Sequence, residues 1–156
     1  MKARFKIKEK DYVIRMAVIL SALLAPYFCI FFAGFQQSLS AYWNTDMQPV
    51  FIFANAATSY YLFSIPNWRT SALCLLLVTA FSVDAYELTH NILAGVFFLL
   101  TIIPLYKSNH FRWTILLYLS AIFVFPYSML GAEIVAITAL CTYHSLLLRK
   151  IYNISR

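Results

Sequence analysis

Two long apolar stretches constrain this chain more than any other feature of its sequence. Residues 71–106 and residues 113–148 each run for 36 positions with few charged side chains. One helix of that length would reach about 54 Å, well beyond the ~30 Å hydrocarbon layer of a bilayer. Each stretch must therefore fold back on itself. The breaks predicted from the turn-forming and helix-breaking residues are Asp84 to Asn91 and Pro126 to Gly131.

Two shorter apolar runs precede these stretches. Met16 to Phe35 follows a basic, amphiphilic tail and reads as an uncleaved membrane anchor. Gln48 to Ile65 has Pro49 in its first turn and Pro66 after its end. The chain is 62% hydrophobic and 12% charged, whereas soluble domains are about half apolar and about a quarter charged. Surplus apolar surface of this size indicates a protein that faces lipid.

The predicted fold is therefore all-α, a polytopic membrane helix bundle that forms a single transmembrane domain over residues 1–156. Basic cytoplasmic tails cover residues 1–15 and 149–156. The expected spans are about 16–36, 48–65, 71–86, 90–106, 112–128 and 132–148. The last four are short, which favours little tilt or a locally thin bilayer.

The formal charge of +6 does not indicate a nucleic-acid partner, because the basic residues are not gathered on one face. With six spans and a cytoplasmic N-terminus, all twelve Lys and Arg residues fall on the cytoplasmic side, as the positive-inside rule expects. They are Lys2, Arg4, Lys6, Lys8, Lys10, Arg15, Arg69, Lys107, Arg112, Arg149, Lys150 and Arg156. The expected location is the bacterial inner membrane, with both termini in the cytoplasm.

Polar and ionisable side chains gather at the three outer turns. Ionisable residues at or within a membrane are functional candidates because they are costly to keep there. The candidate ligand-binding or ion-binding residues are Asp46, Asp84, Glu87, His90 and Glu133. On a continuous helix Asp84, Glu87 and His90 would share one face. The alternative is that these groups only meet water or cap helices, with Glu133 as a charge favoured near a helix N-terminus.

The other polar residues within the spans read as structural. Asn55 lies among small residues, where it favours close helix packing with a hydrogen bond between helices. His144 reads as a histidine satisfied within the bundle rather than a ligand. The three cysteines lie in apolar runs without a paired spacing, and we expect buried free thiols. No metal site and no cofactor is predicted.

The segment from Ser38 to Met47 resembles a motif of small bacterial six-span membrane proteins of unknown function. Those proteins carry S-x-S-A-Y-Y and Thr-x-Met after the first span and an acid that opens the last span. The matching residues here are Tyr42, Trp43, Thr45, Met47 and Glu133. The chain departs from the pattern at Gln48-Pro49, where an Arg-Asp pair is usual, and at Leu148-Arg149-Lys150, where the family often has a Trp and Lys-Gly. The resemblance implies topology and no activity.

A more distant similarity is to membrane hydrolases of the alkaline ceramidase and adiponectin-receptor type, which hold zinc with three histidines. This chain has three histidines, with Asp84 and Ser82 besides. Zinc ligands must converge on one centre at ~2.0–2.1 Å. The predicted topology separates His90, in an outer turn, from His110 and His144, in an inner loop and near the inner face, so a shared metal is not expected.

Three functional hypotheses remain open at this point. The first is a protein with an outward-facing acidic and histidine pocket for a cation, a proton or a polar ligand, which serves sensing, transport or partner binding. The second is a membrane-embedded hydrolase or transferase that acts on a lipid headgroup with the same acids. The third is an immunity-type or scaffold protein that binds another membrane protein. The expected partners are the lipid bilayer and a membrane-protein partner or a second copy of the chain.

Overall fold

The computed structural model describes residues 8–108 and 111–155, and within these ranges all of the regular secondary structure is helical, joined by turns. Lys2, Arg4, Lys6, His110 and Arg156, which the sequence places on the cytoplasmic side, lie outside the described residues. The elements in order are α1 (Glu9–Ala33), η1 (Leu39–Asn44), α2 (Gln48–Phe63), η2 (Pro66–Trp68), α3 (Arg69–Ala80), α4 (Glu87–Lys107), α5 (Trp113–Val124) and α6 (Met129–Ser155). The predicted all-α helix bundle is confirmed.

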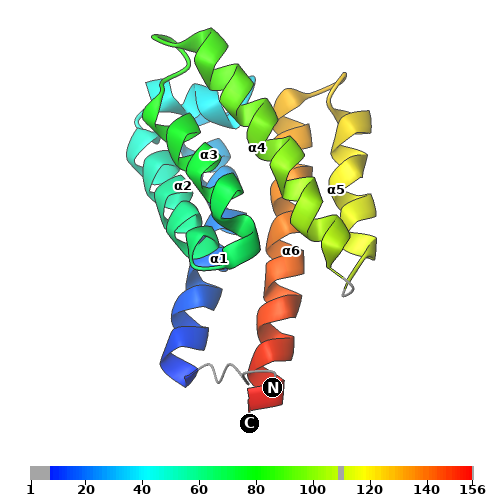
Figure 1. Ribbon diagram of the computed structural model, residues 1–156. Coiled ribbons are helices and arrows are strands. Elements are labelled where there is room, and N and C mark those ends of the chain that lie inside the picture. The colour runs from blue at the N-terminus through cyan, green and yellow to red at the C-terminus, as the bar shows by residue number, and fades with distance from the viewer. Residues whose placement is uncertain (1–7, 109–110, 156) are drawn as a thin grey trace.

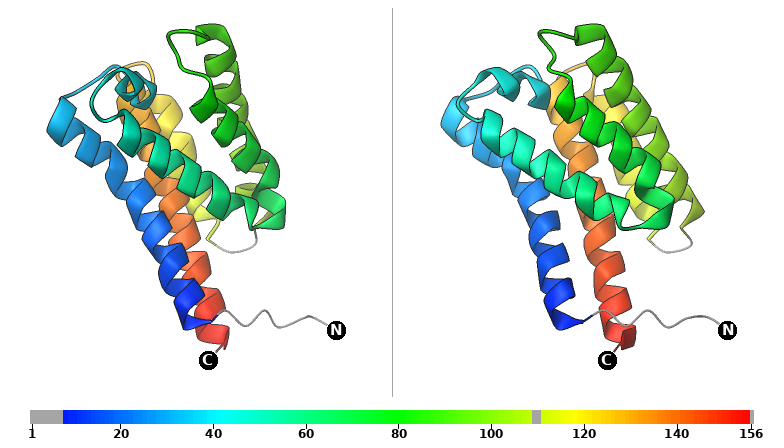
Figure 2. Two further views of the ribbon diagram at one scale, coloured as in Figure 1. Left: turned by 90° about the vertical axis from the view of Figure 1, so that its left-hand side faces the viewer. Right: turned by 60° about the vertical axis from the view of Figure 1, so that its left-hand side comes forward.

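The six α-helices run alternately up and down, so that the connections fall at two opposite ends of the bundle (Figure 1). One end carries η1, the α3–α4 turn and the α5–α6 turn, and we call it the loop end. The other carries the α2–α3 turn, the α4–α5 connection and the described helix ends nearest both termini, and we call it the N/C end. Figure 2 shows α1 and α6 extending together beyond the other helices at this end.

The helices pack in an order that leaves α5 at the side. α1 packs against α2 and α6, α2 packs against α3, and α3 packs against α4. α5 packs extensively against α6 and only slightly against α4. Tyr118 links α5 to α4, because its Oη lies 2.6 Å from Thr101 Oγ1 and 3.0 Å from the carbonyl oxygen of Phe98. α1, α2, α3, α4 and α6 are therefore the helices that can surround a common interior.

Among the described residues, three helices are long and apolar enough to cross a membrane: α1, α4, and α6 over Met129–Ile154. α2 has 16 residues, and α3 and α5 have 12 each. At 1.5 Å per residue these reach about 24 and 18 Å, less than the hydrocarbon thickness. The predicted span at 71–86 is thus a helix that ends at Ala80, followed by a turn, and the predicted span at 112–128 ends at Val124.

Helix ends also differ from the predicted tails. α1 begins at Glu9, inside the predicted basic tail, and α6 continues through Arg149 and Lys150 to Ser155. The reason is packing between the two extensions, because the rings of Tyr12 and Tyr152 stack at 4.3 Å between centroids. The predicted C-terminal tail is therefore largely a continuation of the last helix.

The end of α1 fixes the path of the loop that follows. Gly34 adopts φ 72° and ψ −178°, a region of backbone space that is essentially restricted to glycine. Its carbonyl accepts a hydrogen bond of 2.7 Å from the hydroxyl of Tyr42, a residue with 0% exposure. This turn brings η1 back over the end of the bundle. The three cysteines are buried and unpaired, as predicted.

Candidate functional site

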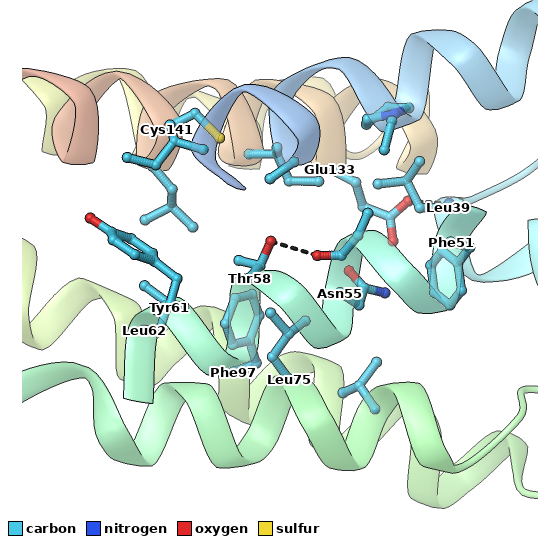
Figure 3. A pocket seen from close by; sticks show the side chains of 18 of the residues that line it. Leu39, Phe51, Asn55, Thr58, Tyr61, Leu62, Leu75, Phe97, Glu133 and Cys141 are labelled. Atoms are coloured by element: carbon cyan, nitrogen blue, oxygen red, sulfur yellow. Dashed lines mark hydrogen bonds between the residues drawn. The ribbon is translucent and has the colours of Figure 1, made fainter. Parts of the chain in front are cut away.

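A cavity of about 120 Å³ lies between α1, α2, α3, α4 and α6. Most of its lining is apolar, and the polar side chains that reach it are Ser40, Asn55, Thr58, Tyr61, Glu133 and His144. Figure 3 shows Glu133 beside Leu39 at one end of the cavity and Tyr61 at the other, with Asn55 and Thr58 between them. The cavity therefore has polar groups at both ends, and Asn55 and Thr58 of α2 lie along its otherwise apolar middle.

Glu133 occupies the loop end of the cavity, one turn into α6. Its Oε2 accepts a hydrogen bond of 2.7 Å from the backbone N–H of Leu39, 94 residues earlier in the chain. A backbone hydrogen bond lies nearby, where Leu130 N–H donates to the carbonyl of Gln37 at 3.1 Å. The first loop is thus attached to the start of the last helix at two points.

The position of Glu133 has an energetic consequence. The carboxylate is half-buried and lines a cavity whose other walls are mainly apolar. One charge-assisted bond to a backbone amide offsets part of the cost of removing a carboxylate from water. The rest of the cost is offset when a proton, a cation or a donor group occupies the cavity beside it. Glu133 is therefore a group that favours a ligand with positive or donor character.

His90 holds the same loop from the opposite side. It is 3% exposed, its Nε2 lies 2.7 Å from Ser40 Oγ, and its Nδ1 lies 2.7 Å from the carbonyl oxygen of Phe81. A carbonyl oxygen only accepts, so Nδ1 must carry hydrogen. In the neutral ring Nε2 then accepts from the Ser40 hydroxyl. His90 consequently joins η1, the start of α4 and the end of α3.

Glu133 and His90 therefore bind adjacent residues of one loop, Leu39 and Ser40. Both of these residues also line the cavity. A ligand in the cavity contacts Leu39 and Ser40, and the positions of these two residues are fixed by their bonds to Glu133 and His90. Such an arrangement can couple occupancy of the cavity to the position of the loop.

The other predicted site residues lie elsewhere. Asp46, Asp84 and Glu87 are exposed to solvent at the loop end. Asp84 lies in the turn before α4, which begins at Glu87, so the helical face expected to join Asp84, Glu87 and His90 is not formed. Of the five predicted residues, His90 and Glu133 point into the bundle and bind the same loop, at Ser40 and Leu39. Among the residues described, no three His, Cys, Asp or Glu side chains gather as a metal site.

Sequence reasoning missed a polar stripe on α2. Asn55, Thr58 and Tyr61 follow i, i+3, i+6 spacing and all line the cavity. Thr58 Oγ1 donates to the carbonyl of Ala54 at 2.7 Å, which satisfies the hydroxyl within its own helix. The helical spacing of these residues was the available signal. The sequence alone did not show that this face of α2 lines a cavity.

The opposite end of the cavity is built around His144, which is 4% exposed. Eleven residues separate it from Glu133 on α6, a rise of about 16 Å. Its Nδ1 lies 3.2 Å from Tyr61 Oη, and its ring contacts that of Trp68 at 4.4 Å between centroids. His90 and His144 thus have separate partners in different parts of the bundle, and His110 lies outside the described residues.

Comparison of the chain with protein-family models, with curated proteins and with solved structures finds no significant match in any of the three. The geometry of the cavity and of its two polar ends is therefore what supports a functional proposal.

Proposed function

We propose that this protein binds a small bilayer-soluble molecule in the cavity between its helices and acts as a membrane sensor or carrier for that molecule. The observation that supports this best is the Glu133 carboxylate at one end of a mostly apolar cavity. Apolar cavities of ~150 Å³ stay dry and take a benzene ring, and this cavity is of comparable size, about 120 Å³. A single ring or a short alkyl chain suits it.

The ligand in this proposal carries a cation or a hydrogen-bond donor that faces Glu133. Such a group supplies the positive charge or hydrogen that a carboxylate needs in apolar surroundings. The apolar body of the ligand lies along the middle of the cavity, against side chains such as Phe97 and Leu140. Because Leu39 and Ser40 line the same space, binding is coupled to the first loop.

We further propose six membrane passes, with both termini in the cytoplasm of a bacterial cell. The three connections of the loop end, residues 34–47, 81–86 and 125–128, contain no lysine or arginine, and the positive-inside rule assigns such connections to the outer face. Flanking turns and local thinning of the bilayer accommodate the shorter helices α2, α3 and α5.

Cysteine labelling tests this topology. In a variant whose three native cysteines are replaced, single cysteines are introduced at the exposed positions Asn44, Asp84 and Lys107. A membrane-impermeant maleimide added to intact cells should label the first two positions and spare the third until the membrane is opened. Labelling of Lys107→Cys in intact cells, or protection of Asp84→Cys, contradicts the orientation.

Binding is tested with a probe that matches the proposed chemistry. 2-Phenylethylammonium joins one aromatic ring to a primary ammonium, and ethylbenzene is the same skeleton without the charge. Cys29 and Cys141 line the cavity, whereas Cys74 is buried outside it. We expect the ammonium probe to slow N-ethylmaleimide modification of Cys29 and Cys141, measured by mass spectrometry, and to leave Cys74 unchanged.

Three variants separate binding in the cavity from general effects. Glu133→Gln keeps an acceptor for the Leu39 amide but removes the charge, and it should weaken the ammonium probe at least tenfold. Ala22→Phe fills the cavity from α1 and should abolish protection, whereas Ala17→Phe on the exposed side of α1 should not. Equal protection in Glu133→Gln and in the unmodified protein would remove Glu133 from the site.

A further inference from the structure

A second hollow, of about 180 Å³, lies at the N/C end of the bundle. Its walls come from η2, from the last turn of α4, and from Tyr143 and Leu147 of α6. Among the described residues, none lines both this hollow and the cavity beside Glu133. The two spaces are separate, so an inference about this hollow stands or falls independently of the proposed function.

Two buried aromatic side chains bring hydrogen-bond donors to the hollow. Trp68 is 2% exposed and Tyr143 is 4% exposed, their ring centroids lie 5.8 Å apart, and both line this space. Within the described part of the chain, neither Trp68 Nε1–H nor the Tyr143 hydroxyl has a hydrogen-bond partner. Both atoms keep some accessible surface, since the unpartnered atoms that are fully enclosed are Ser59 Oγ and His144 Nε2. Because the two rings are otherwise enclosed, the hollow is the space from which a partner can approach these donors.

The rim of the hollow adds a positive charge. Lys107, in the last turn of α4, and Asn67 of η2 both line the hollow and are exposed. An ammonium group has three donors and no acceptor, and a side-chain amide has two donors besides its oxygen. The described lining residues include no acid, and the described acids of the N/C end, Glu9 and Asp11, belong to α1. The hollow therefore gathers donors and one cation.

The position of the hollow along α4 indicates where its ligand comes from. α4 is a candidate membrane span, and it ends at Lys107. Tryptophan and basic side chains at the ends of spans lie at the level of the lipid headgroups. Basic pockets between membrane helices bind anionic headgroups at that level. Pro104 and Leu147 give the hollow an apolar wall beside its donors, which suits the glycerol and the first acyl carbons of a lipid.

We propose that this hollow binds a phosphate group, whose oxygens accept hydrogen bonds from the Lys107 ammonium, Trp68 Nε1–H and the Tyr143 hydroxyl. A phosphate accepts several hydrogen bonds and carries the charge opposite to that of Lys107. An anionic phospholipid headgroup and a small soluble phosphate offer these donors the same oxygens, so the test compares the two sources.

The fluorescence of Trp68 reports occupancy of the hollow directly. The sequence has three tryptophans, so Trp43→Phe together with Trp113→Phe leaves Trp68 alone in the full-length chain. This variant, in a maltoside detergent without phosphorus, is titrated with dihexanoylphosphatidylglycerol, with dihexanoylglycerol and with inorganic phosphate. The first two probes share their acyl chains and differ in the phosphate headgroup.

We expect phosphatidylglycerol to move the emission of Trp68 to longer wavelength in a saturable way, because the indole N–H gains a charged acceptor. Dihexanoylglycerol should not produce this shift. Saturation by inorganic phosphate also supports the site and identifies a soluble phosphate as a source. Absence of a saturable shift with both phosphate probes, or an equal shift with dihexanoylglycerol, overturns the proposal.

Matched substitutions assign the binding to the named donors. Tyr143→Phe removes one hydroxyl and keeps the ring, and it should raise the half-saturating phosphatidylglycerol concentration about tenfold, as expected for a hydrogen bond to a charged group. Lys107→Gln should raise it about threefold, because an exposed ion pair is screened. The controls are Tyr106→Phe, whose ring is 74% exposed, and Lys10→Gln at the start of α1, and each should change it less than twofold. Unchanged binding in both Tyr143→Phe and Lys107→Gln, or equal losses in the controls, overturns the assignment.

A second measurement uses the protein with all three tryptophans, in case the single-tryptophan variant does not fold. Native mass spectrometry from the same detergent counts the lipid molecules that stay bound. Phosphatidylglycerol should be retained at lower added concentration than dihexanoylglycerol, and Tyr143→Phe should reduce this preference. Equal retention of the two lipids by the unmodified protein contradicts the phosphate contact.

Discussion

The contact between Ser40 and His90 gives the sharpest prediction about stability. Both residues are buried, at 9% and 3% exposure, and Ser40 Oγ lies 2.7 Å from His90 Nε2. Ser40→Ala removes the donor and leaves a buried acceptor unsatisfied, which costs about 1–3 kcal/mol. His90→Ala also removes the bond to the Phe81 carbonyl, so it should destabilise the fold more than Ser40→Ala does.

A double-mutant cycle isolates the pair. The two single variants and the double variant should give a coupling free energy of about 1 kcal/mol, the net value of one buried hydrogen bond. Folding free energies can be measured by titration with a denaturing detergent in mixed micelles, followed by circular dichroism. The loop end should also become more open, so modification of Cys29 should be faster in either single variant.

Ser38→Ala is the matched control, because Ser38 lies on the same loop and makes no side-chain capping bond. Its free energy of unfolding should stay within about 0.5 kcal/mol of the unmodified protein. Additivity of Ser40→Ala and His90→Ala within about 0.3 kcal/mol would show that the contact is not formed in solution. The argument that His90 holds the loop over the cavity would then fail.

Substitutions at Gly34, Tyr118 and Glu133 probe the loop end and the outlying helix, with unfolding free energy as the measurement. Gly34→Ala should cost about 1–3 kcal/mol because of its backbone conformation, whereas Gly95→Ala in the middle of α4 should be neutral or stabilising. Tyr118→Phe should cost about 1 kcal/mol and loosen α5 from α4, and the exposed Tyr127→Phe should not. Glu133→Ala should destabilise the fold by about 1.5–3 kcal/mol because it removes the acceptor for the Leu39 N–H. Glu133→Gln should cost less, since the glutamine side chain keeps an acceptor oxygen. If Glu133→Gln proved more destabilising than Glu133→Ala, the stabilising role given to the Leu39–Glu133 hydrogen bond would be refuted.

Much of the helix pattern was predictable from local features of the chain. The folding back of residues 71–106 and 113–148 is confirmed by the turns at 81–86 and 125–128. The length of each apolar run indicates that a break must occur, and polar residues in the first stretch and Pro126 in the second mark its place. Helix ends were predicted less well. The extension of α1 and α6 at the N/C end depends on Tyr12 stacking on Tyr152, two residues from opposite ends of the chain.

The candidate site was predictable in part. His90 and Glu133 stood out because ionisable groups are costly at a membrane. Asp46, Asp84 and Glu87 fitted the same criterion and are exposed. Residue type and position in the sequence do not separate the two inward-facing residues from the three exposed ones. Only the packing of η1 against α4 and α6 separates them.

The length and spacing of apolar runs determined that this chain forms an α-helical bundle with candidate membrane spans, since both properties are local and depend on neighbouring residues. Tertiary structure alone decided that Glu133 meets Leu39 across 94 positions, that His90 meets Ser40 across 50, and that the ring of His144 is buried against Tyr61 and Trp68. These contacts depend on the rotation and offset of each helix against its neighbours. A change of one residue in that rotation turns a side chain by about 100°, which separates a cavity wall from a lipid-facing surface.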